Sequence, residues 1–175
     1  MQKCAFFDRD GVINKDNGYV YKISDFVFND GLFPLLRTLK TQGYLLLVIT
    51  NQSGIERGYY TEFDLKVLHQ FMQEEIQAQC GFGFDKIYHC PHLPSKNCDC
   101  RKPKTGMIKA ACKDFNIDLT QSFFVGDKIT DMQCAQEAGI NGKFLLGEAE
   151  VIDISLQNIQ KIATLQELHS IINKL

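Results

Sequence analysis

Two aspartates separated by one residue stand near the start of the chain. Asp8 and Asp10 follow the short apolar run of residues 4–7 and precede Gly11, so we expect them at a turn after a strand. At such a turn, carboxylates can bind Mg²⁺, and one of the pair can attack phosphorus while the other gives and takes a proton. Alone, this pattern is also typical of an ordinary turn.

Polar side chains follow two further apolar runs. Thr50 ends the run of residues 44–50 and begins a segment of hydroxyl, amide and backbone N–H donors suited to phosphoryl oxygens. The side chains that follow it are Asn51, Gln52 and Ser53. Asp127 ends another run and offers a further carboxylate to a metal. Asp131 falls on the next helix, where it could orient its neighbours or only favour the helix N-terminus.

Three cysteines and one histidine gather in the segment 90–100. These residues are Cys90, His92, Cys98 and Cys100. Three thiolates and one imidazole complete a tetrahedral zinc site, so we expect Zn²⁺ to order this loop rather than to take part in chemistry. Polar residues between the ligands disfavour the alternative of buried free thiols. The other cysteines are scattered through predicted strands and helices and are expected to be free thiols.

A basic pair follows the last cysteine of this cluster. Lys102 suits the neutralisation of a phosphoryl group and a carboxylate, whereas Arg101 suits bidentate recognition of phosphate or hydroxyl groups. A basic pair is usually only solvated, but this one is anchored beside the expected zinc loop. We therefore expect both side chains in the site.

Short apolar runs alternate with longer segments of helical period, which indicates right-handed crossovers on a mostly parallel sheet. The expected strands are residues 4–8, 44–50, 84–88, 122–126 and 142–146. The expected helices are residues 32–42, 62–79, 105–115, 129–138 and 164–173. Ligands of such sheets bind at the carboxyl ends of the strands, where the polar groups above would meet. We predict one α/β domain over residues 1–175, with helices flanking the sheet.

Taken together, these segments resemble, in chain order, the four motifs of the haloacid dehalogenase phosphatases. The matching residues are Asp8-Arg9-Asp10-Gly11, Thr50, Lys102, and Gly126-Asp127 with Asp131. The resemblance implies a Rossmann-like fold with Asp8 as nucleophile and Asp10 as general acid/base. It implies that Thr50 and Lys102 stabilise the phosphoryl group. It also implies that Asp8, Asp127 and the backbone carbonyl of Asp10 bind Mg²⁺.

Within that superfamily, residues 16–20, 50–59 and 126–132 are similar to the heptose 1,7-bisphosphate 7-phosphatases. This resemblance implies hydrolysis of the 7-phosphate through a phospho-aspartate, in the biosynthesis of nucleotide-activated heptose for cell-surface polysaccharide such as lipopolysaccharide. The anomer at C1 stays open. The resemblance assigns contacts with substrate or its phosphate to Asp16, Asn17, Gly18, Tyr19, Asn51, Gln52, Ser53, Arg101 and Lys128.

Two other functions compete with this one. Histidinol-phosphatases share the catalytic motifs and the zinc loop, and only the loops 16–19 and 52–58 favour the heptose enzyme. Alternatively, the zinc cluster could serve a non-catalytic module that binds nucleic acid or protein. The net charge of -2 and the lack of a basic helix or aromatic series in the zinc segment argue against that module.

The composition limits the binding partners and the cellular location that we expect for this protein. The net charge of -2 provides no general attraction for nucleic acid or anionic membrane, so a small sugar phosphate is the expected partner. No stretch approaches the roughly 20 apolar residues of a membrane span, and the first residues do not resemble a signal peptide. We therefore expect a cytoplasmic protein, and a monomer because no long apolar stripe demands a partner. Lacking a large inserted segment, it should have no large cap domain.

Overall fold

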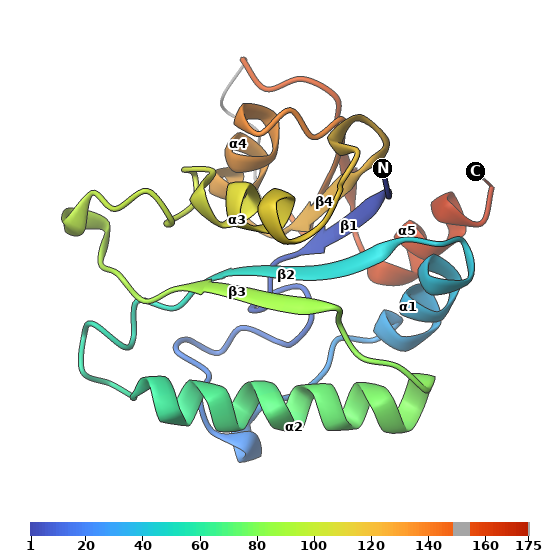
Figure 1. Cartoon of the computed structure of the whole chain (residues 1–175). Helices are drawn as coiled ribbons and strands as arrows, with labels where there is room; N and C mark the ends of the chain where they lie inside the picture. Colours follow the sequence, from blue (N-terminus) through green and yellow to red (C-terminus); the bar gives the residue numbers. More distant parts are fainter. Residues whose placement is uncertain (149–154, 175) are drawn as a thin grey trace.

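The computed structural model describes residues 1–148 and 155–174 (Figure 1). Within these residues, six parallel strands form one sheet in the order β3-β2-β1-β4-β5-β6. The strands are β1 (Cys4–Phe7), β2 (Leu45–Asn51), β3 (Lys86–Cys90), β4 (Phe123–Gly126), β5 (Gly142–Leu146) and β6 (Ile159–Ile162). The strand order reverses between β1 and β4, which is the place where open sheets of this kind bind ligands.

Helices cover both faces of the sheet (Figure 1). They are α1 (Leu32–Thr41), α2 (Glu62–Cys80), α3 (Gly106–Asp114), α4 (Ile129–Glu137) and α5 (Leu165–Ile172). Side chains of α1, α2 and α5 pack in one hydrophobic core, and those of α3 and α4 pack in a second. Because strand side chains alternate between faces, Phe7 enters the first core and Phe6 the second. No helix among the described residues combines the length and the apolar character needed to cross a membrane.

Local signals in the sequence explain where α2 begins. Thr61 caps the helix, since its Oγ1 accepts the N–H of Asp64 at 3.1 Å and the Asp64 carboxylate accepts the N–H of Thr61 at 2.7 Å. This reciprocal pair satisfies two backbone donors that the first turn leaves free. It therefore fixes the point at which the loop after β2 turns into the helix.

The predicted α/β class is confirmed, and the five predicted strands and five predicted helices are all present. β3 begins two residues later than predicted, because the side-chain amide of Gln73 takes the backbone hydrogen bonds of Phe84 at 2.8 and 2.9 Å. β3 also runs on to Cys90, so the cluster of three cysteines and one histidine begins inside the sheet. No large cap domain occurs in the described residues, where the segment between β1 and α1 holds only the short turn η1 (Ile23–Asp25).

Two kinds of element escaped prediction. The edge strand β6 has exposed side chains at its two central positions and shows no alternation. The turns η1, η2 (Pro94–Lys96) and η3 (Leu119–Gln121) are three residues long, which is too short to display a period.

Candidate active site

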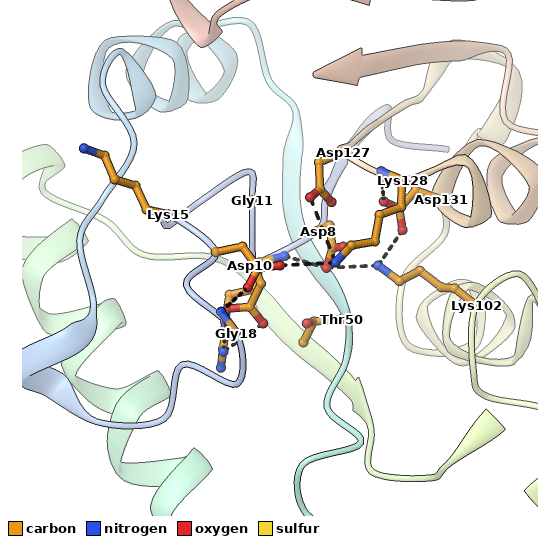
Figure 2. Close-up of polar contacts among 12 residues, drawn as sticks. Asp8, Asp10, Gly11, Lys15, Gly18, Thr50, Lys102, Asp127, Lys128 and Asp131 are labelled. Atoms are coloured by element: carbon orange, nitrogen blue, oxygen red, sulfur yellow. Dashed lines mark hydrogen bonds and ion pairs between the residues drawn. The ribbon is translucent and has the colours of Figure 1, made fainter. Parts of the chain in front are cut away.

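The carboxyl ends of β1, β2 and β4 meet at one edge of the sheet. Phe7 of β1 pairs with Val48 of β2 on one side and with Val125 of β4 on the other. The residues at the ends of these strands or just after them therefore converge, as Figure 2 shows for Asp8, Thr50 and Asp127. A pocket of about 520 Å³ opens at this edge, lined by Asp8, Asp10 and Lys102 among others.

Lys102 lies between two buried carboxylates (Figure 2). Its Nζ is 2.9 Å from Oδ1 of Asp8 and 2.7 Å from Oδ1 of Asp131, and it donates to the carbonyl of Ile49 at 2.7 Å. Burial disfavours the charged form of Lys102, but Asp131 and Asp8 outweigh it and raise its pKa above the usual value. Lys102 is therefore a fixed cation beside Asp8.

The carboxylates of this site carry more negative charge than one lysine balances. Burial raises the pKa of Asp8 to about 7, with help from Asp131 and Asp127 and against the effect of Lys102. Burial is also the main cause that raises the pKa of Asp127 to about 6. A nearby cation would stabilise the charged forms of these two carboxylates and lower their pKa values again.

The donor set fits a divalent cation. Asp8, Asp127 and Asp131 each place a carboxylate oxygen within 4.8 Å of the others. Oδ1 of Asp127 is buried and has no hydrogen-bond partner among the described residues. Gly11 makes room for this carboxylate, because a Cβ at that position would lie 2.1 Å from Oδ2 of Asp127. A hard cation such as Mg²⁺ would bind this unpaired buried oxygen and would balance the excess negative charge around it.

The side chain of Asp10 is held apart from these carboxylates. Nη2 of Arg9 donates to both of its oxygens, at 2.7 and 2.9 Å. Asn14 donates to Oδ1 at 3.0 Å and Gln52 donates to Oδ2 at 2.8 Å. The position suits proton transfer at the pocket rather than metal binding by the carboxylate. Sequence reasoning missed Arg9 and Asn14, both fully buried.

Gln52 connects the acid/base candidate to the second strand. Its amide donates to Oγ1 of Thr50 at 2.9 Å as well as to Asp10, and its carbonyl accepts the hydroxyl of Tyr60 at 2.5 Å. A hydroxyl that accepts one bond keeps its own hydrogen to donate. Thr50 can therefore donate to a phosphoryl oxygen. Tyr60, which also lines the pocket, was not among the predicted substrate contacts.

Most of the predicted substrate contacts surround the pocket. Its lining includes Asp16, Gly18, Tyr19, Asn51, Gln52, Ser53, Arg101 and Lys128. Asn17 does not line it: Oδ1 of Asp16 accepts the N–H of Gly18 at 2.9 Å, and this tight turn leaves Asn17 exposed at its tip. The contact predicted for Asn17 stays a prediction.

Asn51 has a structural contact that the sequence did not indicate. Its side-chain carbonyl accepts the N–H of Lys102 at 3.1 Å, and its amide donates to the carbonyl of Lys102 at 3.3 Å. Asn51 also pairs with Cys90 in the register of β2 and β3. It thus ties the Lys102 segment to the sheet.

The four predicted zinc ligands come together. The Sγ atom of Cys90 lies 3.0 Å from that of Cys100 and 3.6 Å from that of Cys98, and Nδ1 of His92 lies 3.3 Å from Sγ of Cys100. Although burial opposes it, hydrogen bonds from the Arg101 N–H and the neighbouring thiols lower the pKa of Cys98 to about 6, which favours a thiolate. The cluster is compatible with structural zinc.

The loop with this cluster forms one wall of the pocket. Nη1 of Arg101 donates to the carbonyl of His92 at 3.2 Å, so a side chain of the pocket is fixed to a cluster residue. Glu56 binds the same loop through the backbone N–H of Leu93 and through Lys96, at 3.3 Å. The order of the cluster is thereby coupled to the shape of the pocket.

Comparison with known proteins assigns the family. The family described as polynucleotide kinase 3 phosphatase matches residues 3–144. A D-glycero-beta-D-manno-heptose-1,7-bisphosphate 7-phosphatase of Helicobacter pylori is 50% identical over 144 residues, which cover 82% of this chain and 83% of that protein. The chain belongs to the heptose-bisphosphate phosphatase family. A D-glycero-alpha-D-manno-heptose-1,7-bisphosphate 7-phosphatase of Campylobacter jejuni is likewise 50% identical over 146 residues, 83% of each chain.

A solved structure of this family supports the same assignment. The D,D-heptose 1,7-bisphosphate phosphatase from B. bronchiseptica superimposes with a TM-score of 0.86 at 27% identity, over 98% of both chains. That protein was crystallised with magnesium and phosphate. The resemblance predicted from the motifs, to haloacid dehalogenase phosphatases and within them to the heptose enzymes, is therefore confirmed.

Proposed function

We propose that this protein hydrolyses the 7-phosphate of D-glycero-D-manno-heptose 1,7-bisphosphate. One observation carries the chemistry: Asp8 lines a polar pocket with the ammonium of Lys102 2.9 Å from its Oδ1 and the carboxylate of Asp127 close by. The named relatives, at 50% identity, support the sugar bisphosphate as substrate and do not favour histidinol phosphate.

The first chemical step is phosphoryl transfer to Asp8. A carboxylate oxygen of Asp8 attacks phosphorus, the bond from phosphorus to the sugar oxygen breaks, and the Asp10 carboxyl gives its proton to that oxygen. Lys102 neutralises negative charge beside the nucleophile, and the hydroxyl of Thr50 donates to a phosphoryl oxygen. The sugar then leaves with a hydroxyl at C7.

The second step releases phosphate. A water attacks the phosphorus of the phospho-aspartate while the Asp10 carboxylate takes its proton. Inorganic phosphate departs and the Asp8 carboxylate is restored. Mg²⁺, held by Asp8, Asp127 and the backbone carbonyl of Asp10, would supply charge neutralisation at the phosphoryl oxygens.

The loops supply recognition of the sugar. The pocket is lined by Asp16, Gly18, Tyr19, Asn51, Gln52 and Ser53, and by Arg101 from the wall fixed to the metal cluster. Lys128 also lines the pocket, and its Nζ lies 3.4 Å from Oδ2 of Asp16. In this proposal, zinc bound by Cys90, His92, Cys98 and Cys100 holds that wall, and the enzyme works as a cytoplasmic monomer without nucleic acid.

Phosphate release tests the proposal. Purified protein with Mg²⁺ is assayed on both anomers of the heptose bisphosphate and on histidinol phosphate, because the two relatives are named for different anomers. We expect at least one heptose anomer to be the better substrate by roughly 100-fold or more in kcat/KM. The Asp8→Asn variant should show no turnover. Equal or better hydrolysis of histidinol phosphate would refute the proposed substrate.

A further inference from the structure

Arg9 is the one residue between the two catalytic aspartates, and its side chain is fully buried. Its guanidinium makes three kinds of contact. Nη2 donates to both oxygens of Asp10, Nη2 also donates to the carbonyl of Val20 at 2.6 Å, and Nη1 lies 3.3 Å from Nε2 of His69. Asn14 and Gln52 each hold a single oxygen of Asp10, whereas Arg9 spans both.

His69 reaches this arginine from α2 and is itself 9% exposed. A guanidinium has only donors, so Nε2 of His69 must accept the hydrogen bond and the ring must carry its hydrogen on Nδ1. A neutral ring is also favoured electrostatically, because burial, Arg9 and His89 lower the pKa of His69 to about 3. His69 is therefore a permanent acceptor at the back of Arg9.

Packing alone does not account for a histidine here. The hydrophobic core already takes Leu68, Met72 and Ile76 of the same helix, and an aliphatic side chain would be buried at position 69 without the cost of desolvating an imidazole. The hydrogen bond to Arg9 is what an aliphatic residue could not provide. Without it, Nη1 would have no side-chain acceptor among the residues that the structure describes.

We propose that His69 is a positioning residue for catalysis: it holds Arg9 so that the guanidinium orients the carboxyl of Asp10 toward the leaving oxygen. This inference rests on the proposed function, in which Asp10 protonates the sugar oxygen. Arginine has a long side chain with many rotamers, and contacts at both ends of the guanidinium restrict it to one. Loss of the His69 contact should therefore misplace the acid without touching the nucleophile.

Three variants test this proposal: His69→Leu removes the acceptor, His69→Gln keeps one, and His89→Leu is the matched control. His89 lies near His69, at 6.3 Å between ring centroids, but bonds to the exposed Glu62 and not to Arg9. Each variant is assayed for kcat/KM on the heptose bisphosphate and on p-nitrophenyl phosphate. The nitrophenolate leaves without protonation, so its release does not depend on the acid.

We expect His69→Leu to lower kcat/KM on the sugar bisphosphate roughly tenfold and on the aryl phosphate less than about twofold. His69→Gln should stay within about threefold of the wild type on both substrates, and His89→Leu within about twofold. All assays are run well below the unfolding temperature of each variant. His69→Met gives the same comparison if the leucine variant does not fold.

Equal losses on the two substrates in His69→Leu would overturn the proposal, as would a glutamine variant that is folded and no better than the leucine variant. Failure of the proposed function looks different, because the wild type would then not hydrolyse the heptose bisphosphate. In that case the same ratio is measured with whichever alkyl phosphate the wild type does hydrolyse, and the role of His69 is still decided.

Discussion

The ammonium nitrogen of Lys102 lies 2.9 Å from Oδ1 of Asp8, and these side chains are only 1% and 7% exposed. The same nitrogen lies 2.7 Å from Asp131, so one buried cation serves two carboxylates. A third carboxylate, Asp127, is 4.0 Å from the amino group of the more exposed Lys128. The site therefore holds several carboxylates close together, next to the point where a phosphate has to bind.

Replacing Lys102 by methionine should affect both folding and catalysis. Two carboxylates would stay buried without their cation, so we expect unfolding in urea with EDTA to be easier by about 3 kcal/mol. Activity should fall at least about 100-fold, because the charge beside the nucleophile is lost. Lys86→Met is the control: its ion pair with Asp114 is 47% and 40% exposed, so its loss should cost less than about 1 kcal/mol. Similar losses in both variants would contradict the role of Lys102.

The raised pKa of Asp8 predicts a pH dependence of the metal-free protein. Folding moves this pKa from 3.8 to about 7, so its contribution to stability is complete below about pH 4 and is lost as the pH rises through about 7. The Asp8→Asn variant has no such loss. In EDTA, its melting temperature should rise relative to the wild type between about pH 5 and pH 8. Excess Mg²⁺ should reduce this difference. A difference that is independent of pH would contradict the prediction.

Gly11→Ala should weaken magnesium activation specifically. The new methyl would collide with the Asp127 carboxylate, which a Cβ would approach to 2.1 Å. Gly43→Ala is a matched control: both glycines have a positive φ, of 87° and 81°, but a Cβ at Gly43 would meet no other part of the described structure within 4 Å. Both variants should lose about 1 kcal/mol of stability. Only Gly11→Ala should raise the magnesium concentration for half-maximal activity, by roughly tenfold. An unchanged magnesium requirement would count against Asp127 as a ligand.

Removal of one predicted zinc ligand, Cys98, should make the pocket wall less ordered. We expect Cys98→Ser to bind less than one zinc per chain by mass spectrometry and to melt about 5 °C lower than the wild type. KM should rise more than kcat falls, because the wall carries recognition and the nucleophile lies on the sheet. The exposed Cys112 gives the control, Cys112→Ser, with unchanged metal content. Full stability and activity after zinc loss would argue against a structural role for the metal.

Much of the fold could be predicted because its signals are local. Gly43 at the end of α1 and Thr61 at the start of α2 mark boundaries that depend only on neighbouring residues. The late start of β3 could not be predicted in this way. It depends on the side chain of Gln73 reaching Phe84 across a turn, and that contact competes with strand pairing.

The same distinction between local signals and long-range contacts applies to the candidate site. Asp8, Thr50 and Asp127 were predictable because parallel strands bring their carboxyl ends to one edge, and the zinc ligands because their spacing is short. The direction of the Arg9 side chain could not be predicted, because its partner His69 lies on a helix that is far away in the sequence. Asn51 was assigned to substrate, but its amide is bonded to the backbone of Lys102, which no spacing rule reveals.

The pairing of Asn51 with Cys90 anchors the loop 90–100 to the sheet and leaves only its tip open to sequence change. One end of the loop 90–100 is part of the sheet, and its other end leads directly into the segment that Asn51 holds at Lys102. The exposed tip, residues 94–97, hangs between these anchors. Because Pro94 of this tip lines the pocket, we expect substitutions in the tip to change the sugar preference and to leave the catalytic charges in place.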